Sequence, residues 1–231
     1  MTKEKLISIL FMLMAVPITI FSGIYFLDDR KYYFISILII LEIFIPFCLS
    51  FEKKKPEARE LVIIAVMTAV AVVGRFAFYM IPQFQAMTAI IIIAGIALGA
   101  DTGFLVGAVS AFVSNIFLGQ GPWTPWQMFA WGIVGFLSGL IVRKTDIKGI
   151  QIMLAVFGFI ITMAVYGVVM NIQAALSMMP EFNLNAVISC IALGLPYDLI
   201  HSGSTAVFLL IAGKPMLNIM NRIKLKYGAC K

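Results

Sequence analysis

Residues 103–142 read GFLVGAVSAFVSNIFLGQGPWTPWQMFAWGIVGFLSGLIV, and this stretch decides the fold. Its two apolar runs, Gly103–Leu118 and Trp126–Val142, are each close to the length of about 20 residues that a helix needs to cross a lipid bilayer. The connection Gly119–Trp126 holds two tryptophans, two prolines, a threonine and a glutamine. Prolines limit the conformations of such a loop, and indole rings favour the membrane–water interface. The stretch therefore predicts a hairpin of two membrane helices with a stiff aromatic loop at one surface.

The composition of the whole chain agrees with that prediction. Apolar residues make up 62% of the 231 residues, charged residues make up only 12%, and the mean hydropathy is +1.03. A soluble domain of this length has too little interior to bury so much apolar surface. The apolar runs are continuous, so we expect an all-α, polytopic membrane helix bundle.

The apolar runs divide the chain into about eight spans. Two of them form a transmembrane pair in residues 1–51, before a charged cytoplasmic linker at residues 52–60. Six more form a core at residues 61–214, and a basic cytoplasmic tail occupies residues 215–231. The predicted spans are Leu6–Phe26, Tyr33–Leu49, Leu61–Met80, Ala86–Gly99, Gly103–Leu118, Trp126–Val142, Ile150–Ile172 and Leu184–Ala212.

Basic residues give the predicted orientation. When the N-terminus is placed in the cytoplasm, fourteen of the 17 Lys and Arg residues fall on the cytoplasmic side, and only Arg30, Lys31 and Arg75 fall outside. Because cytoplasmic loops carry an excess of Lys and Arg, both termini are predicted to be cytoplasmic and the Gly119–Trp126 loop extracellular. The stretch Met216–Lys226 mixes apolar and basic residues, as a helix at the membrane surface would. The net charge of +6 therefore gives no indication of nucleic-acid binding.

Several functional classes are disfavoured by motifs that the sequence lacks. It has no Gly-x-x-x-x-Gly-Lys-Ser/Thr nucleotide-binding loop, no His-Glu-x-x-His metal motif and only one histidine. No set of nucleophile and base is visible, so we expect neither an enzyme nor a bound cofactor or metal. The carboxylates predicted near membrane depth are few, namely Glu42, Asp101 and Asp198, which weakens the case for a proton-coupled carrier.

Four stretches of the core carry a resemblance to a known family. They are Glu60–Ala69, the small-residue hairpin from Ala94 to Asn115, the loop and helix from Gly119 to Gly139, and Leu195–His201. Together they resemble the substrate-binding S-components of energy-coupling-factor (ECF) transporters, which import vitamins into bacteria. The Trp-Thr-Pro-Trp-Gln run at residues 123–127 is most similar to the cobalamin-specific members. The resemblance covers residues 60–214, so the N-terminal pair departs from the family's six-helix pattern.

The resemblance implies a division of labour among subunits. This chain would bind a vitamin, with cobalamin favoured, at its extracellular face in the bacterial cytoplasmic membrane. A separate membrane coupling subunit and two cytoplasmic ATPases would supply the energy. The family's Ala-x-x-x-Ala contact with the coupling subunit maps onto Ala65 and Ala69, although such pairs also serve ordinary packing between helices. Glycine pairs at the same spacing are assigned to internal packing: Gly95 with Gly99, and Gly103 with Gly107.

Substrate contacts are predicted around the extracellular mouth of the core. Aromatic faces can cover a planar ligand, while amides, hydroxyls and a guanidinium can bond to its edge groups. The predicted contacts at the mouth are Arg75, Phe76, Tyr79, Asn115, Gln120, Trp123, Thr124, Trp126, Gln127 and Asn171, together with Pro122 of the same loop. Tyr197 is predicted to line the floor of the cavity. Other roles stay open: the tryptophans can form an interfacial belt, Arg75 can extend to lipid headgroups, and Asn115 can bridge helices.

Asp198 and His201 are predicted to form a structural or gating polar pair. Their spacing of three residues allows them to share one helix face. His201 comes 17 residues after Leu184, which is about 25 Å along a helix and too deep for an extracellular site. Glu42, in the N-terminal pair, has the character of a bundle-facing acid whose partner the sequence does not reveal.

Other functions remain as alternatives at this point. The chain could be an S-component for another vitamin or a precursor, which changes only the ligand. It could be an autonomous facilitator or ion-coupled carrier, which would transport without ATPase partners. A non-transporting membrane assembly or sensor subunit would bind no vitamin at all.

Overall fold

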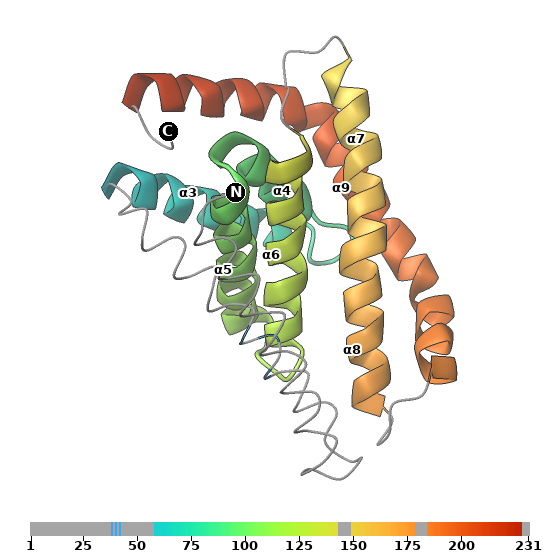
Figure 1. The fold of residues 1–231 in the computed structure, drawn as a ribbon. Helices are drawn as coiled ribbons and strands as arrows, with labels where there is room; N and C mark the ends of the chain where they lie inside the picture. Colours follow the sequence, from blue (N-terminus) through green and yellow to red (C-terminus); the bar gives the residue numbers. More distant parts are fainter. Residues whose placement is uncertain are drawn as a thin grey trace, which may run out of the picture.

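The computed structural model describes residues 58–142, 149–178 and 184–227, together with Leu38, Ile40 and Glu42. The predicted N-terminal pair, apart from those three residues, lies outside the described residues. All the elements described are helices (Figure 1). The α7, η2 and α8 segments run on without a break, so six helical rods result. In chain order the elements are α3 (Ala58–Phe76), α4 (Met87–Leu98), α5 (Ala100–Leu118), α6 (Thr124–Ile141), α7 (Ile150–Ile161), the π-helix η2 (Thr162–Gly167), α8 (Val168–Met178) and α9 (Leu184–Tyr227).

The length and composition of these helices are those of membrane-crossing elements. Three described helices are long and apolar enough to span a bilayer: Ala100–Leu118, Ile150–Met178 and Leu184–Lys224. Met87–Leu98 is a shorter apolar helix. The prediction of a helical membrane protein is therefore confirmed. The total of eight spans and the cytoplasmic placement of both termini stay predictions.

α4 lies at the centre of the bundle. Its sequence, MTAIIIIAGIAL, is apolar around nearly the whole circumference, and such a helix is stable only where every face is covered. It packs against α3, α5, α6 and α9, and all of its residues except Ile96 are buried. Thr88 carries the polar side chain of this helix and Gly95 is its glycine, and each makes a specific contact with a neighbouring helix.

Glycines bring α4, α5 and α6 into close contact. A Cβ atom on Gly95, Gly103 or Gly107 would overlap backbone atoms of α6, and one on Gly135 would overlap the backbone of Gly103. Because these positions carry no side chain, the helices meet backbone to backbone, as predicted for the first three. Gly99 differs from them: its φ is +98°, nothing lies within 4 Å of where its Cβ would be, and it forms the turn between α4 and α5.

α9 is the longest helix, with 44 residues. It continues through the boundary predicted at residue 214, with Pro196 and Pro215 inside it. A proline within a helix removes a backbone hydrogen bond and bends the helix, and Figure 1 shows the C-terminal part of α9 turning across the end of the bundle. There Lys224 Nζ donates to the carbonyl oxygen of Ala97 at 2.7 Å. Because cations stabilise helix C-termini, this contact fastens the segment to the end of α4.

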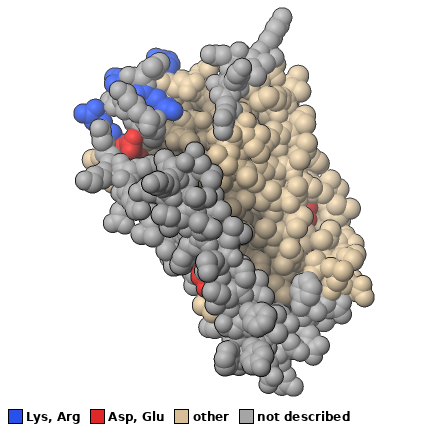
Figure 2. All heavy atoms as spheres, viewed as in Figure 1, with Lys and Arg blue, Asp and Glu red and all other residues tan. Residues whose placement is uncertain are grey.

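Positive charge gathers at the same end of the molecule. Figure 2 shows Lys and Arg side chains clustered over the C-terminal part of α9 and the start of α3, away from the α5–α6 loop. This distribution agrees with the charge asymmetry on which the predicted orientation depends. The described basic residues of these two segments are Arg59, Lys214, Arg222, Lys224 and Lys226.

Candidate functional site

Arg75 is the centre of a polar network at the end of the bundle that carries the α5–α6 loop. It lies in the last turn of α3, and its Nη1 donates to Ser114 Oγ at 2.5 Å and to Asn115 Oδ1 at 2.9 Å. Its guanidinium carbon lies 4.9 Å from the centre of the Trp131 ring, which is a cation–π distance. Of the two roles considered for Arg75, this geometry favours the inward one over an extension to lipid headgroups.

Asn115 joins that guanidinium to the start of α6. Its Nδ2 donates to Thr124 Oγ1 at 3.2 Å and to Gln127 Oε1 at 2.7 Å. Thr124 Oγ1 also accepts a hydrogen bond from the backbone N–H of Gly121 at 3.2 Å, which holds the loop against α6. Four of the residues predicted for the site, Arg75, Asn115, Thr124 and Gln127, thus come together from α3, α5 and α6.

A cavity of about 290 Å³ opens beside Arg75. Its wall is formed by the end of α3, the connection at residues 77–86 and the end of α5. Arg75 is the charged side chain of this wall, so the cavity favours ligand groups that are anionic or accept hydrogen bonds. Residues of the wall include Arg75, Tyr79, Pro82, Gln83, Gln85 and Leu118.

Phe76 lies on a different surface from the cavity. Its ring packs edge-on against Phe117 of α5, with 5.7 Å between the ring centroids. Both rings line a separate apolar groove together with valine and alanine side chains of α3 and the residue after it. The structure therefore separates Phe76 from its predicted neighbours Arg75 and Tyr79, because successive residues of a helix point in different directions.

The second half of the 77–86 connection is anchored to α9. The backbone N–H of Gln85 donates to Ser204 Oγ at 3.3 Å, and that hydroxyl lies 3.2 Å from the Gln85 carbonyl oxygen. The Phe84 ring packs on Phe208, with centroids 5.5 Å apart. Met80, nearer the tip, is 90% exposed. The connection therefore has an exposed tip at the mouth of the cavity. Its second half, which includes Phe84 and Gln85, is held in place by α9.

The aromatic loop between α5 and α6 divides into inner and outer side chains. Trp126 is 7% exposed, and its indole N–H has no hydrogen-bond partner among the described residues. Gln120, Pro122 and Trp123 are exposed instead, and Gln120 Nε2 donates to the carbonyl oxygen of Phe112 at 3.0 Å. Trp126 is thus the inner aromatic group of the loop. Trp123 is exposed, as is expected of an indole at the membrane–water interface.

A buried group behind Arg75 was not predicted from the sequence. Trp131 Nε1 donates to Thr88 Oγ1 at 2.9 Å, and Thr88 Oγ1 lies 2.7 Å from His201 Nε2. The side-chain nitrogen of Gln85 is 3.3 Å from the same histidine nitrogen. Tyr166 packs against both Trp131 and His201, with ring centroids 4.6 Å apart in each case. The available signal was a threonine within the isoleucine-rich run of α4, because a buried hydroxyl requires a partner.

Asp198 and His201 contact different partners in the described structure, so they do not form the predicted pair. Asp198 Oδ2 accepts a hydrogen bond from Asn171 Nδ2 at 2.7 Å, whereas His201 faces Thr88 of α4. Three residues turn a helix by less than a full turn, and here the difference directs the two side chains to different helices. The prediction from depth separated His201 from the extracellular site. In the structure, however, contacts through Thr88 and Trp131 connect His201 to Arg75. Tyr197 is 55% exposed and lies outside the cavity wall.

α3 exposes one apolar face. Ala65 and Ala69 both lie on this face. Small residues four positions apart allow another helix to approach closely, so the geometry leaves Ala65 and Ala69 available to a partner helix. The exposed larger side chains beside them are Leu61, Val62, Val66, Val70 and Val73.

A family model covers most of the chain. The family described as "ECF-type riboflavin transporter, S component" matches residues 55–221. The matched range begins just before α3 and ends within α9, so it contains the complete polar network around Arg75.

Curated relatives match a shorter part of the chain. A UPF0397 protein of Aliivibrio fischeri strain MJ11 is 33% identical over 98 residues, which are 39% of this chain and 53% of the relative. A UPF0397 protein of Vibrio atlanticus strain LGP32 is 31% identical over 93 residues, which are 38% of this chain and 50% of the relative. The chain spans about half the length of the curated relatives it matches. No solved structure matches the chain.

Proposed function

The chain belongs to the family of ECF-type riboflavin transporter S components, and from this premise we propose that it binds a vitamin at the loop end of its helix bundle. An S-component is the substrate-specific membrane subunit of a transporter, so the chain is a transporter subunit and not a catalyst. We assign the supply of energy to a separate module, made of a membrane coupling subunit and two cytoplasmic ATPases.

The observation that carries this proposal is the convergence of polar groups beside the cavity. Arg75 is held by Ser114 and Asn115 and lies over the face of Trp131, and it also forms part of the cavity wall. An arginine inside a membrane bundle is energetically costly, and such residues usually mark a substrate path. Its charge and its fixed position suit the recognition of a carbonyl, phosphate or carboxylate group of a ligand.

Two vitamins are candidates, and each has its own support. Riboflavin is favoured by the family description and by the small size of the cavity, because about 290 Å³ is close to the lower limit of the roughly 300–1,000 Å³ of small-molecule sites. Cobalamin is favoured by the similarity of the Trp-Thr-Pro-Trp-Gln run, but a corrinoid is much larger than a flavin. Cobalamin binding would therefore require the exposed tip of the 77–86 connection to move outward.

The orientation completes the proposal. The loop end would face the outside of the bacterial cytoplasmic membrane, and both termini would face the cytoplasm. The cluster of Lys and Arg at the opposite end supports this orientation. The exposed face of α3 that contains Ala65 and Ala69 would then meet helices of the coupling subunit within the membrane.

Titration of the purified full-length protein with riboflavin and cobalamin, in detergent and without partner subunits, tests the proposal. We expect saturable binding of one vitamin that Arg75→Ala weakens by about 10-fold or more, since hydrogen bonds to charged groups contribute about 1.5–3 kcal/mol. Arg59→Ala, an exposed arginine in the first turn of the same helix, is the matched control and should bind as the wild type does.

Two other results would redirect the assignment. Absence of binding to both vitamins and to a wider vitamin panel would overturn the proposal and favour an assembly or sensor subunit. Uptake that persists in cells lacking the coupling subunit and ATPases would instead indicate an autonomous carrier.

A further inference from the structure

One exposed side of α9 changes from apolar to basic near the bend of the helix. Val207 and Ile211 are apolar side chains that are 44% and 69% exposed. Lys214, Asn218 and Arg222 follow and are exposed as well. Successive members of this series are three or four residues apart, so all of them lie along one side of the helix. An apolar side suits hydrocarbon, whereas charged side chains belong outside it. The change therefore indicates the boundary between the hydrocarbon and headgroup layers of a membrane.

The opposite side of the segment after Pro215 is used for packing within the protein. Leu217 and Met220 are buried and belong to the hydrophobic core. On the same side, Lys224 Nζ donates to the carbonyl oxygen of Ala97. An amphipathic helix at a membrane surface usually inserts its apolar side among the lipids. Here that side is covered by protein, so the segment has a fixed position and only its basic side is available to an external partner.

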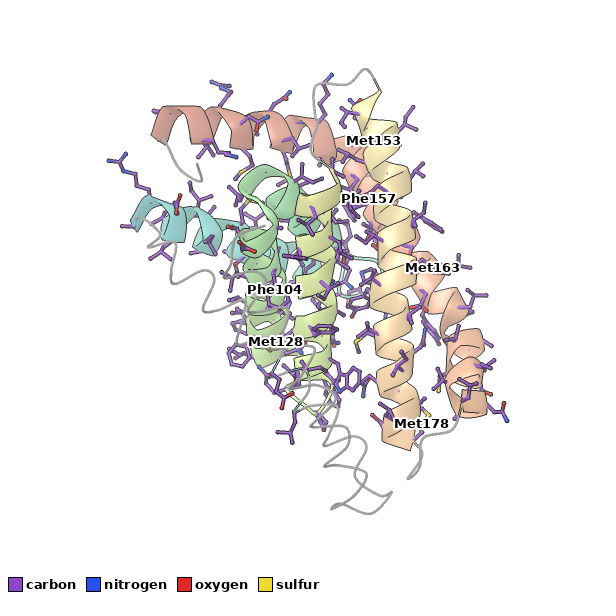
Figure 3. All side chains as sticks on the ribbon, in the orientation of Figure 1. Phe104, Met128, Met153, Phe157, Met163 and Met178 are labelled. Atoms are coloured by element: carbon purple, nitrogen blue, oxygen red, sulfur yellow. The ribbon has the colours of Figure 1, made fainter. Side chains whose placement is uncertain are left out.

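The exposed side of this segment carries an excess of positive charge. Lys226 lies four residues beyond Arg222 and is also exposed, as is Arg59 at the start of α3. Figure 2 shows the Lys and Arg side chains of this end gathered on the surface, and Figure 3 shows nitrogen-tipped side chains extending outward from the last part of α9. Glu60, which follows Arg59, is half-buried. The excess of cations makes this surface complementary to an anionic partner.

We propose that the exposed side of α9 from Lys214 to Lys226 binds the phosphate groups of anionic phospholipids, with Lys214 and Arg222 as its central contacts. Clusters of Lys and Arg directly beyond a membrane-spanning helix attract anionic lipids. A lipid suits the surface better than an acidic protein does, because the basic side continues the exposed apolar side of the same helix. One phospholipid could then place its acyl chains beside Ile211 and its phosphate beside Lys214. The proposal is independent of vitamin binding, which is assigned to the other end of the bundle.

Lipid titration of the full-length protein in a neutral detergent tests the proposal. Phosphatidylglycerol and phosphatidylcholine with identical acyl chains are added separately, and native mass spectrometry counts the lipids bound. Each Lys or Arg near an anionic lipid should strengthen binding about fivefold, so the wild type should prefer phosphatidylglycerol by about 25-fold or more. The double variant Lys214→Gln/Arg222→Gln should keep a preference of about fivefold or less. Both residues are exposed, so we expect the variant to fold normally.

Three controls separate a lipid surface from other effects of charge. Lys214→Arg/Arg222→Lys keeps both charges and should keep the lipid preference. Lys144→Gln/Lys148→Gln removes two charges from the sequence between α6 and α7, outside the described residues, and should keep the preference as well. Inorganic phosphate at the concentration of the lipid should not displace phosphatidylglycerol, because the acyl chains also contribute to binding.

Every outcome bears on the proposal. Equal affinity of the wild type for both lipids, or an unchanged preference in Lys214→Gln/Arg222→Gln, would overturn it. An equal loss in Lys144→Gln/Lys148→Gln would overturn it too, because net charge alone would then explain the preference. A double variant that keeps its lipid preference but no longer co-purifies with the coupling subunit and ATPases would assign the surface to a protein partner instead. Vitamin binding should be the same in all these variants, so this inference and the proposed function can fail separately.

Discussion

The α5–α6 hairpin and the α8–α9 pair are both pairs of apolar helices, yet they are held together in opposite ways. α5 and α6 meet through glycines, and 61% of the α5 span is buried. α8 meets α9 through the Asn171–Asp198 hydrogen bond, and only 11% of an apolar 18-residue stretch of α9 is buried. A backbone contact fixes the distance between two helices, whereas a side-chain hydrogen bond allows that distance to vary. The comparison teaches that the glycine contacts make the α5–α6 hairpin the rigid part of the bundle, and that α8 and α9 are joined more loosely.

Gly135→Ala should produce the largest loss of stability. A Cβ on Gly135 would overlap the backbone of Gly103, so the two helices would have to separate. We expect a loss of about 3 kcal/mol in the free energy of unfolding, at the upper end of overpacking effects. Thermal or denaturant unfolding in one detergent measures it.

Gly203→Ala in α9 is the matched control. Nothing lies within 4 Å of the position of its Cβ, so we expect no loss and a gain of up to about 1 kcal/mol from helix propensity. If both variants unfold like the wild type, the glycine contact does not make the hairpin rigid.

Arg75→Ala should have the next largest effect, and it should act on both stability and binding. It leaves Asn115 Oδ1 without its donor in a buried position, which costs about 1–3 kcal/mol. Arg75→Lys keeps the charge but loses the planar fork, so we expect intermediate stability and affinity. Unfolding and vitamin titration of the same samples measure both effects. An Arg75→Ala protein that is destabilised but binds normally would make Arg75 a structural residue alone.

Thr88→Val and Thr68→Val compare a partnered hydroxyl with an unpartnered one. Thr88 Oγ1 accepts from Trp131 and contacts His201, so its loss leaves a buried indole N–H unsatisfied and should destabilise the protein by about 1–3 kcal/mol. Thr68 Oγ1 is buried with no partner among the described residues, and its replacement should be neutral or stabilising. Equal effects of the two changes in an unfolding assay would contradict the role of Thr88 as a hydrogen-bonding centre.

The predictable parts of the molecule are those that depend on neighbouring residues. The α5–α6 hairpin follows from two apolar runs around a polar loop, and Asn115 follows from its position at the end of the first run. The contact between Thr88 and His201 joins residues 113 positions apart. Spacing rules say nothing about such a contact, because it depends on how α4 and α9 pack. The same limit explains Asp198 and His201, whose spacing predicted a pair while the packing of α9 between two neighbours separated them.

The family and the ligand also differ in how well the sequence alone predicts them. The resemblance depends on four stretches spread through the core, among which the Trp-Thr-Pro-Trp-Gln run is more specific than the small-residue hairpin. The ligand depends on a few side chains, and Arg75 and Trp126 suit any planar vitamin with acceptor groups. The family of the chain therefore followed from the sequence, whereas the choice between riboflavin and cobalamin requires a titration.

Trp126→Phe should have the smallest effect, and it addresses the loop of the α5–α6 hairpin. The substitution keeps an aromatic ring and removes an indole N–H that has no partner among the described residues, so the stability of the free protein should be unchanged. If that N–H donates to the vitamin, the affinity should fall by about 2- to 10-fold, as expected for a neutral hydrogen bond. Trp123→Phe is the matched control, because Trp123 is exposed in the same loop. An equal loss in both variants would assign the loop a covering role, and a loss in Trp126→Phe alone would indicate that the inner side of the rigid hairpin contacts the vitamin.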